Sequence, residues 1–171
     1  MLPLLVATPS IAHAADPSGD GLGGHLRTTD DRLRRLLELG TRTSPTLRAL
    51  VRRLTNSDVV VYLWCERADT APSDGRLTFV SAAGGRRYVV VRLVRFHSRQ
   101  RQIALIAHEL RHAVEVADAP DVVDAESLER EYKRIGYMSS TPTSDRKTFD
   151  TRAAVDAGAQ VMRELTIAED D

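Results

Sequence analysis

At residues 103–117 the chain reads IALIAHELRHAVEVA, and the interpretation of the whole sequence starts from this stretch. Its apolar residues recur with the spacing of an α-helix, and together they form one face that would pack against a core. His108, His112 and Glu115 fall on the opposite face of the same helix. The sequence therefore predicts a helix that packs through one face and presents two imidazoles on the other.

His108, Glu109 and His112 form the motif HExxH. Histidines one helical turn apart can place two neutral imidazole nitrogens on one zinc ion. The glutamate that follows the first histidine can reach a zinc-bound water, whose pKa the metal lowers towards neutrality. Glu109 could then act as general base and pass the proton to the leaving amine of a peptide. We assign His108 and His112 as metal ligands, Glu109 as the catalytic base and Zn²⁺ as the cofactor.

This helix resembles the active-site helix of the zincin metallopeptidases, and in particular that of compact gluzincin-like bacterial secreted proteins. The motif match covers residues 103–117 of the chain. The resemblance implies an α+β fold in which a small antiparallel sheet packs on the HExxH helix, with further helices before and after it. It also implies that a strand near residues 77–80 or 88–96 binds the substrate in extended form, through its backbone hydrogen bonds.

Periodicity and punctuation residues predict the other elements. A first helix begins after Thr29 or Asp30 and is stopped by Gly40, and a second follows the cap Ser44. The run at 58–66 is apolar on both faces, which indicates a central strand. Gly84 and Gly85 suit the tight turn of a hairpin. The expected elements are helices at 28–39, 44–54, 121–135 and 148–165, and strands at 58–66, 76–82 and 86–96.

A catalytic zinc usually has three protein ligands, so HExxH leaves one to be assigned. In gluzincins a glutamate on a later helix completes the site, and residues 149–157 resemble such a segment with Asp150 in place of glutamate. Asp150 is therefore our third ligand, with three alternatives. Glu115 shares the histidine face but is preferred as a hydrogen-bond partner of the site. Asp118 stands where the metzincin pattern has its ligand, and Glu126 lies downstream on a face expected to be exposed.

Hydrolysis also needs a group that stabilises the developing oxyanion. Tyr132, Tyr137, His97 and the arginines are all able to donate a hydrogen bond. We choose Tyr137 as the second catalytic residue because it lies in the loop between the two downstream helices.

Composition bounds the remaining possibilities. Lys+Arg and Asp+Glu both number 24, so the formal charge is 24 − 24 = 0, which is atypical of a general nucleic-acid binder.

Residues 1–14 read as a secretory signal peptide cleaved after Ala14, which predicts a periplasmic or extracellular protein. Residues 15–27 are expected to be a flexible N-terminus and residues 28–168 a single domain. Cys65 is the only cysteine, which excludes an internal disulfide, and no other run is apolar enough to span a membrane.

These features favour a secreted zinc-dependent peptidase acting on a peptide or protein substrate. One alternative is a zincin-like module that binds metal or peptide without turnover. Another is an interaction domain that binds no metal. No nucleic-acid partner is expected, and the sequence sets no oligomeric state.

Overall fold

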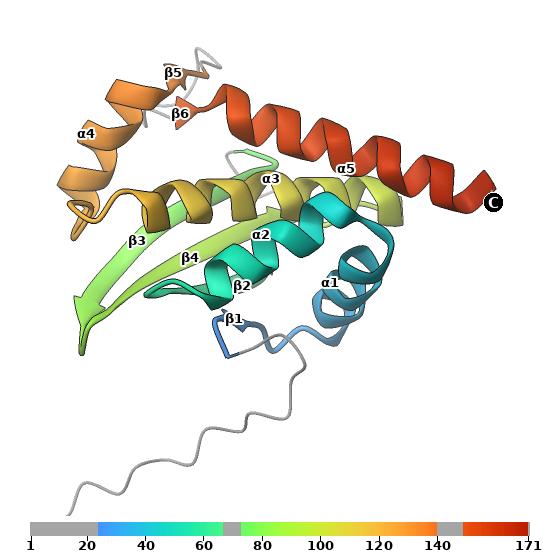
Figure 1. Cartoon of the computed structure of the whole chain (residues 1–171), viewed down its shortest axis with the longest axis horizontal. Helices are drawn as coiled ribbons and strands as arrows, with labels where there is room; N and C mark the ends of the chain where they lie inside the picture. The colour runs from blue at the N-terminus through green and yellow to red at the C-terminus, as the bar shows by residue number, and fades with distance from the viewer. Residues whose placement is uncertain (1–23, 67–72, 140–148, 171) are drawn as a thin grey trace, which may run out of the picture.

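The structure is a computed structural model that describes residues 24–66, 73–139 and 149–170 (Figure 1). The expected signal peptide, residues 1–14, lies outside these described residues. In chain order the elements are β1 (Leu26–Arg27), α1 (Asp31–Thr43), α2 (Pro45–Thr55), β2 (Val59–Glu66), β3 (Gly75–Ala83), β4 (Arg86–Val94), α3 (Arg99–Asp118), α4 (Ala125–Ile135), β5 (Tyr137–Met138), β6 (Phe149–Asp150) and α5 (Arg152–Asp170). The α+β class expected from the sequence is confirmed.

The main sheet is mixed, whereas the sequence predicted an antiparallel one. Its strand order is β1-β2-β4-β3. β3 and β4 form the expected antiparallel hairpin, but β2 pairs with β4 in parallel and β1 pairs with β2 in parallel. The central position predicted for residues 58–66 is confirmed, since β2 has a neighbour on each side. β3 is the long edge strand, so of the two expected substrate strands only 77–80 lies at an edge.

The hairpin and the parallel pair have different causes. Gly84 and Gly85 have φ values of 58° and 71°, a region that glycine adopts without strain, so the turn between β3 and β4 is local. The parallel register of β2 depends instead on a contact between distant residues. Asp58 lies beside Arg87, whose backbone N–H donates to the Asp58 carbonyl at 3.0 Å and whose guanidinium donates twice to its carboxylate at 2.7 Å. No local signal in the sequence reveals that pairing.

The first two helices begin where the sequence predicts. The Asp30 carboxylate accepts hydrogen bonds from the first turn of α1, and the Ser44 hydroxyl accepts one from the first turn of α2. Gly40 does not stop α1, which continues to Thr43. A Cβ at position 40 would lie 2.6 Å from side-chain atoms of both Ile103 and Leu47, so this glycine permits close packing inside a helix.

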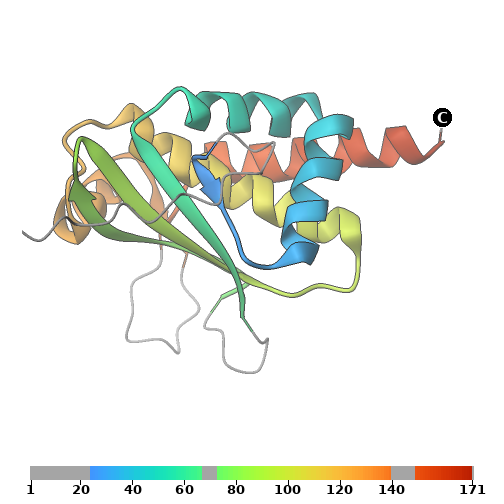
Figure 2. The same ribbon diagram turned by 90° about the horizontal axis from the view of Figure 1, so that it is seen from below.

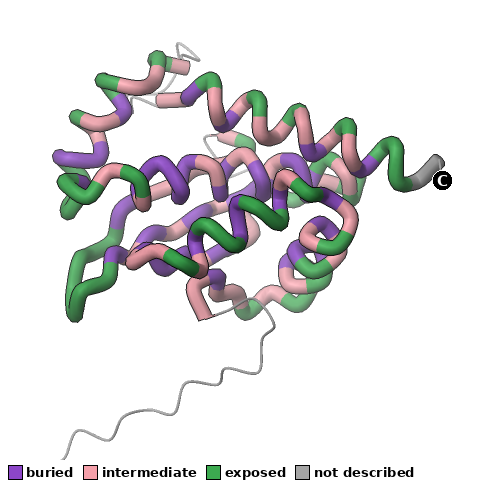
Figure 3. Tube along the Cα trace, viewed as in Figure 1, coloured by how far each residue is buried: buried purple, intermediate pink, exposed green. Residues whose placement is uncertain are grey.

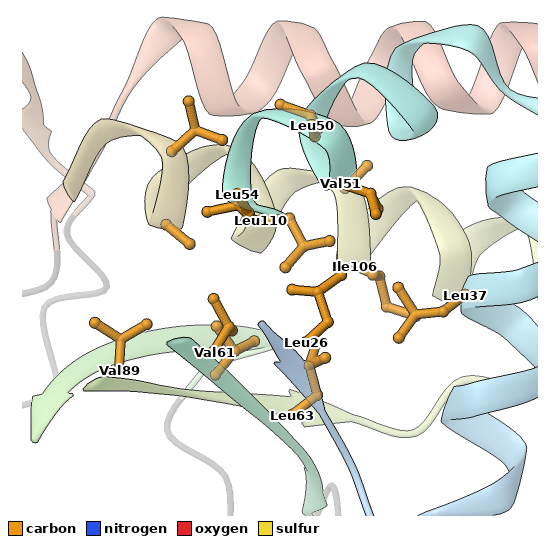
Figure 4. Packing of buried hydrophobic residues seen from close by; sticks show 14 of the residues in the cluster. Leu26, Leu37, Leu50, Val51, Leu54, Val61, Leu63, Val89, Ile106 and Leu110 are labelled. Carbon is orange, nitrogen blue, oxygen red and sulfur yellow. The ribbon is translucent and has the colours of Figure 1, made fainter. Parts of the chain in front are cut away.

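The hydrophobic core lies between the sheet and the helices. Figure 2 shows α1, α2, α3 and α5 on one side of the four-stranded sheet. Ile106 and Leu110 of α3 point towards Val61 and Leu63 of β2, and Leu54 of α2 closes the same layer (Figure 4). All five side chains are at most 2% exposed. The sheet thus packs against α3 through β2, and α2 packs against α3 in the same layer.

The C-terminal part departs from the expected pattern. β5 and β6 form a two-stranded antiparallel ladder with Tyr137 opposite Asp150, in a region expected to be loop and helix. Asp150 therefore precedes α5 and is not part of that helix. The reason is local, because the Thr151 hydroxyl accepts the backbone N–H of Ala154 and so caps the helix one residue after Asp150.

Within the stretch 15–27, expected to be flexible, the structure describes only residues 24–27, and two of these form a strand. Leu26 is 1% exposed, and Leu26 and Arg27 pair with β2, because burying the leucine against the core favours an ordered strand. Among the described residues, every helix is too short or too polar to cross a membrane.

Candidate metal centre

Three side chains with metal-binding atoms converge beside the middle of α3. His108 and His112 come from that helix, and Asp150 comes from the end of β6; their ligand atoms all lie within 4.8 Å of one another. The Asp150 Oδ1 atom lies 3.5 Å from His108 Nε2 and 3.6 Å from His112 Nε2. Tetrahedral zinc with bonds of about 2.0 to 2.1 Å would place neighbouring ligand atoms about 3.3 Å apart. The two spacings that involve Asp150 are close to this value, so the three side chains could hold a metal ion after adjustment of the ligand atoms.

A hydrogen bond from outside the group orients the His112 imidazole. His112 Nδ1 lies 2.9 Å from Glu115 Oε2, and because a carboxylate only accepts, Nδ1 carries a proton. Nε2 can bind a metal once it gives up its own proton. The two rings stand edge to face, with centroids 5.0 Å apart. Glu115 thus takes the role of hydrogen-bond partner that the sequence favoured for it.

Tyr132 of α4 contacts the second histidine of the site, His112. Its ring packs edge-on against His112 with a centroid distance of 5.4 Å, and its hydroxyl donates to the His112 carbonyl at 3.4 Å. The side chain is buried, and burial raises the pKa of the phenol well above 10. Tyr132 is therefore a neutral packing partner of the second histidine.

The charge state of the cluster reflects its burial. Burial lowers the pKa of His108, and the neighbouring His112 lowers it further. Burial also lowers the pKa of His112, but the Asp150 carboxylate 3.6 Å away and the hydrogen bond with Glu115 outweigh it and raise that pKa to about 9. The pKa of Asp150 is lowered despite desolvation, because the His112 and His108 imidazoles lie near its carboxylate. The centre therefore favours an anionic Asp150 facing a cation.

Glu109 lies next to this group in a buried position. It is 3% exposed, and burial raises the pKa of its carboxyl to about 7. Its Oε2 atom has no hydrogen-bond partner among the described residues. A Cβ placed on Gly75 of the edge strand β3 would lie 2.2 Å from Glu109 Oε1. The glutamate thus occupies space that only a glycine at this strand position leaves open.

The histidine face of α3 is more buried than the sequence implied. The prediction treated it as facing away from the packing surface, yet His112 is 5% and Glu115 7% exposed. Buried and intermediate residues make up most of the length of α3 (Figure 3). Helix α5 packs along this face. A Cβ on Gly158 would lie 3.2 Å from the Ala104 carbonyl oxygen and 3.4 Å from His108 Cβ, so a small residue there allows α5 to approach closely.

The other candidates from the sequence lie elsewhere. Asp118 is exposed and paired with Arg53, and Glu126 is exposed and paired with Arg130. Neither belongs to the cluster of ligand atoms. His97 is exposed at the N-terminal side of α3. Tyr137 is half exposed and stands directly opposite Asp150 in the β5–β6 ladder.

Sequence reasoning missed two contributors to the site, Gly75 and Thr151. Gly75 matters through the absence of a side chain, so it leaves no signal in a motif. Thr151 follows Asp150 directly, and its role as a helix cap was readable from a hydroxyl three residues ahead of an alanine-rich run.

Comparison of the chain with protein-family models, with curated proteins and with solved structures finds no match.

Proposed function

We propose that this protein is a zinc-dependent peptidase, with His108, His112 and Asp150 as the metal ligands. The observation that carries the proposal is the convergence of the three ligand atoms beside a buried Glu109. In such a site, zinc lowers the pKa of a water molecule towards neutrality and polarises the substrate carbonyl.

Glu109 is the general base in this proposal. Its free Oε2 atom and a pKa raised to about 7 suit a carboxylate that takes a proton from water and returns it to the leaving amine. Burial keeps bulk water away from the carboxyl, which strengthens its interactions with nearby charges. His112 and Asp150 are the charged groups that act on it.

The edge strand β3 is the proposed binding strand for substrate. Among the described strands none pairs with its outer edge, and its first residue, Gly75, packs against Glu109. An extended peptide that pairs with this edge would pass the general base. Tyr137 is the proposed oxyanion donor, since residues directly opposite in a ladder carry their side chains on the same face, and Tyr137 is opposite Asp150.

The first experiment measures metal content and peptide cleavage on the same preparations. Glu109→Gln should retain one zinc per chain and lose at least about 100-fold in kcat, because only the proton acceptor is removed. His108→Ala and Asp150→Ala should lose or weaken the metal. Glu126→Gln, an exposed glutamate on α4, is the matched control and should behave as the parent. Undiminished cleavage by Glu109→Gln would disprove the mechanism.

A second function, metal or peptide binding without turnover, is favoured by one feature. Asp150 stands where the gluzincin pattern has glutamate, so the ligand set is not the usual one. Stoichiometric zinc in the parent, with no cleavage across a broad peptide library, would support this function over the peptidase.

A further inference from the structure

Thr151 makes contacts on both sides of the metal centre. It is 2% exposed and lies between β6 and α5. Its hydroxyl donates to Glu115 Oε1 at 2.7 Å and accepts from the Ala154 N–H at 3.1 Å. Its own backbone N–H donates to Asp150 Oδ1 at 2.7 Å. Thr151 therefore caps α5, and it also contacts the proposed third ligand, Asp150, and the Glu115 carboxylate on α3.

Each carboxylate oxygen of Glu115 accepts a hydrogen bond from a different segment of the protein. Oε2 accepts from His112, and Oε1 accepts from Thr151. Arg111 Nε lies 3.7 Å from Oε1, beyond hydrogen-bonding distance. A continuous chain of hydrogen bonds thus runs from His112 through Glu115 and Thr151 to Asp150.

These hydrogen bonds bear on how Asp150 is positioned relative to the two histidines. His108 and His112 are held at a fixed spacing by their helix, whereas Asp150 comes from a separate segment that needs its own anchor. An aspartate is also one methylene shorter than a glutamate, so its backbone must lie closer to the histidines. The hydrogen bonds that Thr151 makes with Asp150 and with Glu115 supply this anchor.

We propose that Thr151 is a positioning residue for the metal centre, whose hydroxyl aligns Asp150 with His112 by holding Glu115. The inference rests on the metal ligation proposed above, and it is independent of peptidase activity. Valine has nearly the shape of threonine but cannot donate, so Thr151→Val leaves a buried carboxylate oxygen without its donor. Serine keeps the hydroxyl and loses only a methyl group.

The test is zinc affinity, measured by competition with a chromophoric chelator on the parent, Thr151→Val and Thr151→Ser. Thr151→Val should bind zinc about 10 to 100-fold more weakly, the usual effect of losing an outer hydrogen-bond partner. Thr151→Ser should restore most of the affinity. With Co²⁺ in place of zinc, the visible absorption of Thr151→Val should differ from that of the parent, because the ligand geometry has changed.

Thr46→Val is the matched control. The Thr46 hydroxyl also donates to a glutamate of α5, Glu164, at 2.6 Å, but in the C-terminal half of that helix. This variant should be less stable than the parent and bind zinc as tightly. Circular dichroism of each apoprotein checks the fold, and Thr151→Ala replaces Thr151→Val if the valine does not fold.

Equal zinc affinity in the parent and Thr151→Val would overturn the inference while leaving the metal centre intact. Equal weakening in Thr151→Ser and Thr151→Val would also overturn it, because the methyl group and not the hydroxyl would then matter. A parent that binds no zinc would instead disprove the metal centre itself. Zinc binding without peptide cleavage would disprove only the peptidase.

Discussion

Glu109 and Gly75 form a close contact between the HExxH helix and the edge strand. Alanine at position 75 would place a carbon 2.2 Å from the Glu109 carboxylate, so the carboxylate must move. Gly75→Ala should therefore cost about 1 to 3 kcal/mol of unfolding free energy, the usual cost of overpacking. Peptide cleavage should fall at the same time, because the base is displaced.

A double-mutant cycle in urea separates this clash from any other effect of the glycine. In a Glu109→Ala background there is no carboxylate to displace, so Gly75→Ala should cost almost nothing. The same loss of stability in both backgrounds would show that the strand backbone, and not Glu109, requires glycine at this position.

At the scale of elements, Arg87 of β4 holds the C-terminal end of α3. It is 5% exposed, and its Nη1 atom donates to the carbonyls of Val116, Ala119 and Val122. These carbonyls lie at or just beyond the last turn of α3, and the Val116 and Ala119 carbonyls also accept the backbone N–H groups of Ala119 and Val122. Arg87→Met should cost about 1 to 3 kcal/mol, since all three carbonyls lose a charged donor. Urea unfolding measures this loss, with exposed Arg86→Met as the control; equal effects would contradict the role of Arg87.

The partner of Arg87 gives this contact a pH dependence. The Arg87 side-chain hydrogen bond is the largest cause of a lowered pKa at Asp58, whose ordinary value is 3.8. A lowered folded-state pKa means that the unfolded chain binds the proton more readily. The stabilisation is therefore complete above about pH 4 and is lost as the pH falls through the folded pKa. Asp58→Asn should melt with a weaker pH dependence than the parent below pH 4; identical melting profiles would contradict this.

At the scale of the whole molecule, a metal ion would join two distant parts of the chain. Its proposed ligands lie on α3 in the middle of the fold and on β6 just before the C-terminal helix (Figure 1). An ion that binds only the folded state at 100 times its Kd stabilises that state by about 2.7 kcal/mol. For a domain of this size, zinc should raise the Tm by about 5 to 10 °C.

Thermal melting in buffered zinc and in chelator measures this shift. His108→Ala removes one ligand and should show no zinc-dependent change in Tm. An equal shift in the parent and in His108→Ala would mean that zinc acts at another place on the protein.

What the sequence determined by itself depends on local physics. The spacing of His108 and His112 sets both imidazoles on one helical face, and residues three apart on a helix bring Glu115 to His112. The caps Asp30 and Ser44 and the Gly84–Gly85 turn are equally local, so both helices begin and the hairpin turns where predicted. Asp150 was selected by resemblance to a family pattern, and its segment was wrongly expected to be helical at that residue.

Only the tertiary structure decided how these local pieces combine. The parallel pairing of β2 depends on Asp58 meeting Arg87, and the length of α1 depends on Gly40 meeting Ile103. The link from Glu115 to Thr151 likewise joins residues of α3 to the start of α5. Contacts between residues far apart in the chain leave no periodicity or spacing to read. They exist because packing against a common core brings those residues within hydrogen-bonding or van der Waals distance.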